Sequence, residues 1–89
     1  MKEEPSPSFR DEVLTKYMPE GHLLQWPSKF KRQYIIIEEL AKRFEPGVEY
    51  TEREVDDMLK EIYPRDHCTM RRYLVDLRFV HRKDGIYRR

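Results

Sequence analysis

The sequence has little of several residue types, and each shortage narrows what the chain can be. Its single cysteine, Cys68, excludes an internal disulfide framework and fits a reducing compartment. The longest purely apolar run, Tyr34–Ile37, is far shorter than the ~20 residues that a membrane-spanning helix needs. The first residues also lack the apolar stretch of a secretory signal. We therefore predict a soluble, cytoplasmic protein.

Sequence motifs for catalysis are missing as well. The three glycines form no phosphate-binding loop, and no Ser or Cys stands at motif spacing with His and Asp. Apart from the adjacent His67-Cys68, no soft metal ligands have a recognised spacing. We predict no enzyme activity, no metal and no cofactor. For Cys68, near a helix start and arginines, a redox-active thiol and an inert one both stay open.

The charge is balanced overall but unevenly distributed. Of 89 residues, 39% are charged and 38% hydrophobic, which suits one small polar domain, and the formal net charge is +1. Residues 1–63 carry 10 Lys/Arg and 14 Asp/Glu, a net of −4, whereas residues 64–89 carry 8 and 3, a net of +5. This contrast is typical of a nucleic-acid contact, and also of a solvated surface with internal pairing.

The charged, proline-rich start of the sequence predicts a disordered tail over residues 1–8, and we predict one domain over residues 9–89. A first helix, capped by Ser8, places three apolar residues on one stripe. A second helix is predicted over Ser28–Phe44, ending before Pro46-Gly47. Its expected buried face consists of Phe30, Tyr34, Ile37, Ala41 and Phe44, widened by Ile36 and Leu40. His22–Pro27 between them is interpreted as an edge strand or an extended arm, because Pro27 cannot join a central ladder.

Two capped helices and a hairpin follow. Thr51 and Glu54 form a capping-box pattern, and Asp66 is a good N-cap for a fourth helix after a tight break. The third helix has the apolar set Val55, Met58, Leu59 and Ile62, and the fourth has Met70, Tyr73, Leu74 and Leu77. Val48–Tyr50 reads as a short strand, and Phe79–Arg82 and Ile86–Arg88 as two strands around Asp84-Gly85. This order predicts a mainly α fold with a small β-hairpin, about four helices, of the winged helix-turn-helix type.

Three stretches carry a family resemblance: Gly21-His-Leu with Pro27–Arg32, then Tyr50–Val55, then Thr69–Asp76 closing on Gly85–Arg88. Together they resemble a bacterial domain-of-unknown-function family that is winged-helix-like and is often found alone or at the end of proteins described as transcriptional regulators. The sequence departs from that pattern at His67-Cys68, Met70 and Ile86. The resemblance implies a regulator-like role.

The fourth helix, Asp66 to Leu77, is the candidate recognition helix. Its helical wheel places Arg72 opposite the buried stripe, beside Cys68, Val75 and Asp76, with Thr69 and Arg71 on the flanks. Both arginines suit a phosphate or a guanine edge, and Thr69 suits a phosphate, whereas Asp76 would repel one. The alternative is that Arg71 or Arg72 pairs with carboxylates of the third helix, namely Glu54, Asp56, Asp57 or Glu61.

The hairpin supplies the remaining cations. Arg82, Lys83 and Arg88, with His81 and Arg89 nearby, suit a phosphate backbone, although charged edge strands also prevent aggregation. The predicted nucleic-acid-binding residues are Thr69, Arg71, Arg72, Arg82, Lys83 and Arg88. Lys29, Lys31 and Arg32, at the start of the second helix, are expected to contact carboxylates such as Glu20.

The expected partner is DNA, with RNA left open, and the small size favours a homodimer. Leu23, Leu24 and Trp26 are the candidate dimer contacts. The alternative function is a winged-helix protein-interaction module that does not bind DNA and is anchored by the segment around Trp26.

Overall fold

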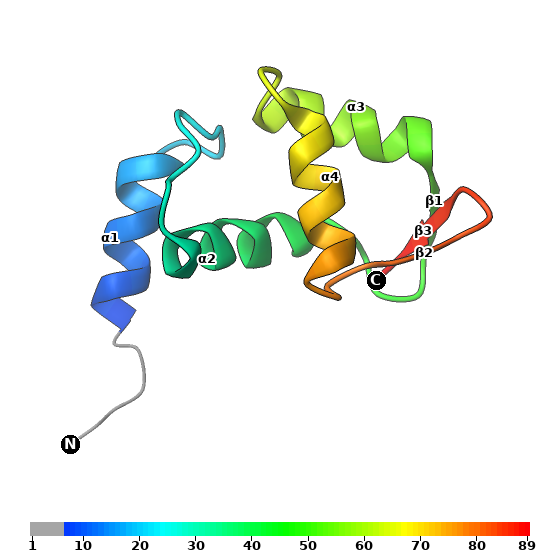
Figure 1. Cartoon of the computed structure of the whole chain (residues 1–89), viewed down its shortest axis with the longest axis horizontal. Coiled ribbons are helices and arrows are strands. Elements are labelled where there is room, and N and C mark those ends of the chain that lie inside the picture. Colours follow the sequence, from blue (N-terminus) through cyan, green and yellow to red (C-terminus); the bar gives the residue numbers. More distant parts are fainter. Residues whose placement is uncertain (1–6) are drawn as a thin grey trace.

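The computed structural model describes residues 7–89, with four helices followed and interrupted by three short strands (Figure 1). In chain order the elements are α1 (Pro7–Tyr17), α2 (Phe30–Ala41), β1 (Glu49–Thr51), α3 (Glu52–Ile62), α4 (His67–Asp76), β2 (His81–Lys83) and β3 (Ile86–Arg88). The predicted mainly α, winged-helix-like fold is confirmed. Most of the predicted tail over residues 1–8 lies outside the described residues, and α1 already begins at Pro7.

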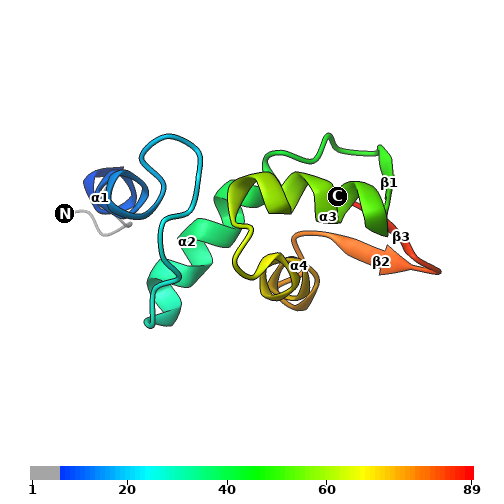
Figure 2. The same cartoon turned by 90° about the horizontal axis from the view of Figure 1, so that it is seen from above.

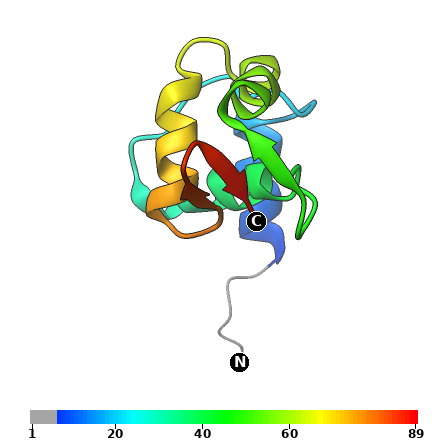
Figure 3. The ribbon, with the colours of Figure 1, turned by 90° about the vertical axis from the view of Figure 1, so that its right-hand side faces the viewer.

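The three strands form one antiparallel sheet in the order β1-β3-β2. Asp84 and Gly85 both have positive φ, 54° and 79°, as a two-residue type I′ turn requires, so the predicted hairpin is confirmed. Its first strand runs over His81–Lys83 and not over the predicted Phe79–Arg82. β1 adds a third strand by pairing Tyr50 with Tyr87, and it begins one residue later than predicted. Figure 3 shows this sheet beside α4.

The core lies where α2, α3, α4 and the sheet meet. The capping box of Thr51 and Glu54 starts α3, and α3 and α4 make the tight helix pair that the sequence predicts. The largest fully buried side chains are Phe44, Ile36, Ile37, Leu40, Leu59, Met70, Leu74, Val55 and Val80. In Figure 2, α2 lies between α1 and α4, so that both of its sides are covered.

Because α2 packs against both α1 and α4, its buried face differs from the predicted one. The predicted helix over Ser28–Phe44 is too long at both ends, and Lys29 rather than Ser28 is its N-cap. Phe30 and Tyr34, predicted as core residues, are 57% and 40% exposed, whereas Ile35 is buried. The prediction used a single stripe, but α1 covers a second side, where Arg10 binds Glu38 at 2.6 Å. The buried face therefore shifts toward the isoleucine triplet.

The segment His22–Pro27 is an extended arm and not a strand. Its backbone is held by Leu23 N–H to Ile62 carbonyl and Leu24 N–H to Tyr17 carbonyl, both 2.8 Å. Leu23 is buried and Trp26 packs against Tyr73 with ring centroids 5.2 Å apart. Of the three residues predicted to mediate a dimer, Leu24 alone is largely exposed, at 60%. The homodimer itself stays a prediction.

The helix α4 is terminated by Arg78, whose backbone has the left-handed conformation. The N–H groups of Arg78 and Phe79 bond to the carbonyls of Val75 and Leu74, both at 3.0 Å, which is the Schellman pattern of helix termination. That pattern needs a positive φ at Arg78, here 66°, and a residue with a Cβ adopts this conformation at a cost.

We expect Arg78→Gly to raise the free energy of unfolding by about 1 kcal/mol, because glycine removes that cost. The matched substitution Arg72→Gly, on the exposed face in mid-helix, should lower it by about 1 kcal/mol. Equilibrium urea unfolding measures both. A loss of stability in Arg78→Gly equal to that in Arg72→Gly would contradict this account of the helix end.

Candidate nucleic-acid interface

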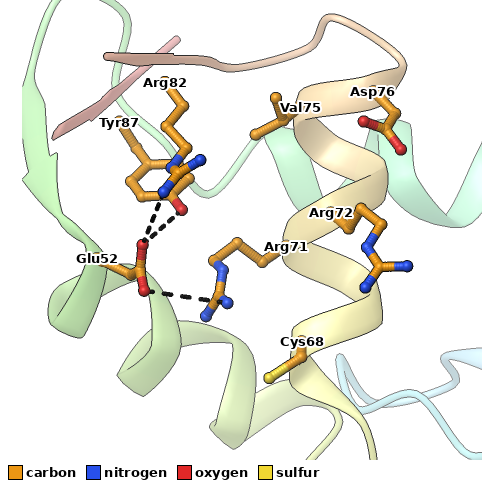
Figure 4. Close-up of a pocket in the computed structure, with 8 residues that line it drawn as sticks. All are labelled: Glu52, Cys68, Arg71, Arg72, Val75, Asp76, Arg82 and Tyr87. Atoms are coloured by element: carbon orange, nitrogen blue, oxygen red, sulfur yellow. Dashed lines mark hydrogen bonds and ion pairs between the residues drawn. The ribbon is translucent and has the colours of Figure 1, made fainter. Parts of the chain in front are cut away.

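A groove lies between the outer side of α4 and the hairpin β2–β3, which we call the wing. Figure 4 shows the side chains that line it, and its volume is about 270 Å³. The lining residues are Glu52, Cys68, Arg71, Arg72, Val75, Asp76, Arg82 and Tyr87. The groove thus combines three arginines with two carboxylates.

The carboxylate of Glu52 joins the elements around the groove. The hydroxyl of Tyr87 donates to its Oε1 at 2.9 Å, and Arg82 Nη2 lies 3.9 Å from the same oxygen. Arg71 Nη2 is 4.0 Å from Oε2 (Figure 4). Glu52 is the first residue of α3, directly after the Thr51 cap, where the helix dipole favours a negative charge. One side chain therefore connects α3, α4 and both strands of the wing.

Arg71 is held by α3 and is not a free cation. Its guanidinium also forms a hydrogen-bonded ion pair with Asp56, and its side chain is only 22% exposed. Burial is the largest single influence and works to lower the pKa of Arg71, but the hydrogen bond to Asp56 and the negative charges of Asp56 and Glu52 together outweigh it, so the pKa is raised. The alternative interpretation of pairing with the third helix therefore holds for Arg71, through Asp56, whereas Arg72 makes no such contact within residues 7–89.

Thr69 is engaged in the cap of α4. Its hydroxyl donates to Asp66 Oδ2 at 2.6 Å, and its N–H donates to Oδ1 at 3.3 Å, which confirms Asp66 as N-cap. These bonds, the hydroxyl first, lower the pKa of Asp66. Beside them Cys68 is exposed, with Sγ 3.6 Å from His67 Nε2. Among the described residues no three His, Cys, Asp or Glu gather as a metal site would require.

The cationic side chains of the wing lie on its two opposite faces. The register pairs Arg82 with Tyr87, so both lie on the groove side, and the Arg82 guanidinium lies 5.9 Å from the Tyr87 ring centroid. Side chains alternate along a strand, so Lys83 and Arg88 lie on the opposite face. Of the predicted set, the groove brings together Arg71, Arg72 and Arg82, while Lys83 and Arg88 flank the wing from its outer side.

The remaining cation prediction is not met in the described part of the chain. Lys31 and Arg32 lie over the ring of Phe9, at 5.0 and 5.6 Å from its centroid, and no contact joins them to Glu20. Phe9 comes from α1, so these cations help to hold α1 on α2.

Sequence reasoning missed Glu52 and Tyr87. They are 35 positions apart and meet only because β1 pairs with β3, which brings the start of α3 against the wing. The capping-box pattern identified Thr51 and Glu54, but it did not indicate that the side chain of Glu52 faces the groove.

The element order, the tight α3–α4 pair and the groove beside the wing define a winged helix-turn-helix-like domain. Residues 22–89 match an uncharacterized protein family conserved in bacteria, DUF2087, and the chain belongs to this family. The predicted membership is thus confirmed, and the match leaves α1 outside it. No curated protein and no solved structure matches the chain. Within residues 7–89, no helix has the length and apolarity to cross a membrane.

The hydrogen bond between Tyr87 and Glu52 makes the stability of the fold depend on pH. Burial, then the hydrogen bond to Glu52, raises the pKa of Tyr87 above its ordinary value of 10.0. The folded state therefore keeps this proton longer than the unfolded state does. The resulting stabilisation is complete below about pH 10 and is lost as the pH rises through the raised value.

We expect wild-type stability to fall relative to Tyr87→Phe as the pH is raised from 9 to 11, because the variant lacks this group. Urea unfolding at each pH measures the difference. Tyr34→Phe, which removes an exposed phenol, is the control and should show no such trend. A constant difference between wild type and Tyr87→Phe over this range would contradict the proposed bond.

Proposed function

We propose that this protein is a small DNA-binding, transcription-regulator-like winged-helix protein that contacts duplex DNA with α4 and the wing. The observation that carries this proposal is the set of cations there that have no ion pair with a described residue: Arg72, Lys83 and Arg88. All three are exposed, and they belong to the segment whose net charge is +5. Arg82, 56% exposed, adds a fourth cation at the edge of the groove.

In this proposal, α4 and the wing have different roles. Arg72 stands on the ridge of α4 that points away from the core, where a helix inserted in the major groove would reach base edges or phosphates. Lys83 and Arg88 lie on the face of the wing opposite the groove, where we expect them to contact the phosphate backbone. Duplex DNA is favoured over duplex RNA, because the deep, narrow major groove of RNA does not admit a helix.

Acidic side chains set a limit on this binding. Glu52 and Asp76 line the groove, and each would repel a phosphate that approached closely. Glu52 also competes with phosphate for Arg82 and Arg71. We therefore propose that the contact of a single copy with random-sequence DNA is weak and depends steeply on salt.

The first test is fluorescence anisotropy of a random-sequence duplex at several salt concentrations. We expect Arg72→Ala, Lys83→Ala and Arg88→Ala each to weaken binding and to reduce the slope of log K against log salt by about 1. Arg53→Ala and Lys60→Ala remove exposed charges on the solvent face of α3 and should change neither slope nor affinity beyond the general charge effect. Binding that is independent of salt, or equally weakened by all five variants, would contradict the proposed surface.

Glu52→Gln gives a second, opposite test. The amide oxygen of Gln can still accept the hydrogen bond from Tyr87 and keep the wing in place. The substitution removes a repulsive charge from the groove and releases Arg82, so we expect severalfold tighter binding of the duplex at low salt and a smaller gain at high salt. Glu61→Gln changes the net charge equally but lies exposed on α3 and does not line the groove. Equal gains in both variants would show that only net charge matters, and the groove would then have no part in binding.

A further inference from the structure

A row of aromatic rings connects the start of α2 with the segment that follows α4. Phe30 and Tyr34 of α2 have ring centroids 6.1 Å apart, and Tyr34 lies 5.2 Å from Phe79, which follows α4. Phe30 is 57% and Tyr34 40% exposed, and Phe79 is half-buried. None of these three residues lines the groove, and Figure 1 shows the start of α2 and the wing on opposite sides of α4.

The fold leaves part of this row without a packing partner. Large aromatic side chains contribute most when they are buried, and neighbouring exposed ones often mark an interaction site. The hydroxyl of Tyr34 also has no hydrogen bond to a described residue, so it is available to an acceptor. The row therefore offers an apolar surface with a free polar group.

The two segments that carry the row contain charges of one sign. The segments that carry it, residues 21–37 and 77–83, contain no Asp or Glu. Lys29 and Arg78 directly precede Phe30 and Phe79, and both are exposed without an ion pair to a described residue. A complementary partner must therefore bring negative charge as well as apolar surface.

This charge pattern argues against a second copy of the chain. In a two-fold dimer through the row, the cations of one copy would face the same cations of the other, and neither segment holds a carboxylate to neutralise them. The ring geometry argues against stacked nucleobases. The rings are inclined to each other by 60° and 57°, so they form no continuous flat platform.

We propose that the aromatic row docks an acidic peptide segment of a partner protein. Leu or Phe side chains of the peptide pack on the exposed rings of Phe30 and Tyr34, and its Asp or Glu side chains face Lys29 and Arg78. The Tyr34 hydroxyl donates to a peptide carbonyl or carboxylate. This surface does not depend on the proposed DNA contact, because none of its residues lines the groove.

The test is selection of phage-displayed random 12-residue peptides on the immobilised full chain. Selected peptides are then synthesised and their binding measured by fluorescence anisotropy. We expect enrichment of peptides that combine Asp or Glu with Leu, Phe or Trp. Phe30→Ala/Tyr34→Ala should weaken them at least tenfold. Leu24→Ala/Val48→Ala, which removes two other exposed apolar side chains, should leave binding unchanged.

Charge reversal separates this proposal from simple hydrophobic capture. Lys29→Glu/Arg78→Glu should abolish binding of the acidic peptides, while circular dichroism verifies that each variant is folded. Enrichment without acidic residues, or binding that survives Phe30→Ala/Tyr34→Ala, would overturn the proposal. It would also be overturned if the row instead served another occupant: binding of a dT20 oligonucleotide, or self-association in sedimentation velocity, that the same double variant removes.

Discussion

The carboxylate of Glu52 is the point on which the arrangement of α4 and the wing depends. It accepts a hydrogen bond from Tyr87 and lies within 4.0 Å of guanidinium nitrogens of Arg71 and Arg82. The wing has only two three-residue strands, and an isolated hairpin of that size is marginal in water. Its position is therefore set by β1 and by this carboxylate, and the position of the wing in turn fixes the shape of the groove.

The same interaction determines which cations are available to a ligand. Arg71 forms ion pairs with Glu52 and Asp56, so it orients α4 and has little charge available for a ligand. Arg72, one position later on the helix, points away from the core and has no ion pair with a described residue. Adjacent arginines with similar sequence surroundings thus have different roles, because a step of 100° on the helix separates a structural side chain from an exposed one.

Local signals in the sequence predicted the elements well. The Thr51–Glu54 capping box, the Asp66 cap and the Asp84-Gly85 turn each depend on residues within four positions, and the structure confirms all of them. The face of α2 was predicted less well, because the sequence does not say that α1 covers a second side. Phe30 and Tyr34 were therefore expected in the core, although the periodicity that indicated a helix was sound.

The candidate site was predicted in part, for the same reason. The helical wheel of α4 placed Arg72 outside, but it could not choose between phosphate and Asp56 as the partner of Arg71. The position of Glu52 beside the wing depends on the pairing between residues 49–51 and 86–88, which no local sequence pattern predicts. Strand alternation also divides Arg82 from Lys83 and Arg88, so a charge count along the wing overstates what one face presents.

The measurement that tests the central proposal most directly is an NMR titration of the ¹⁵N-labelled protein with a short duplex DNA. If α4 and the wing form the DNA contact, the largest amide shifts should fall on α4 around Arg72 and on the wing around Lys83 and Arg88. The amides of α1 and of the solvent face of α3 should move little. Shifts concentrated on α1 or on α3, or no shifts at low salt, would contradict the account.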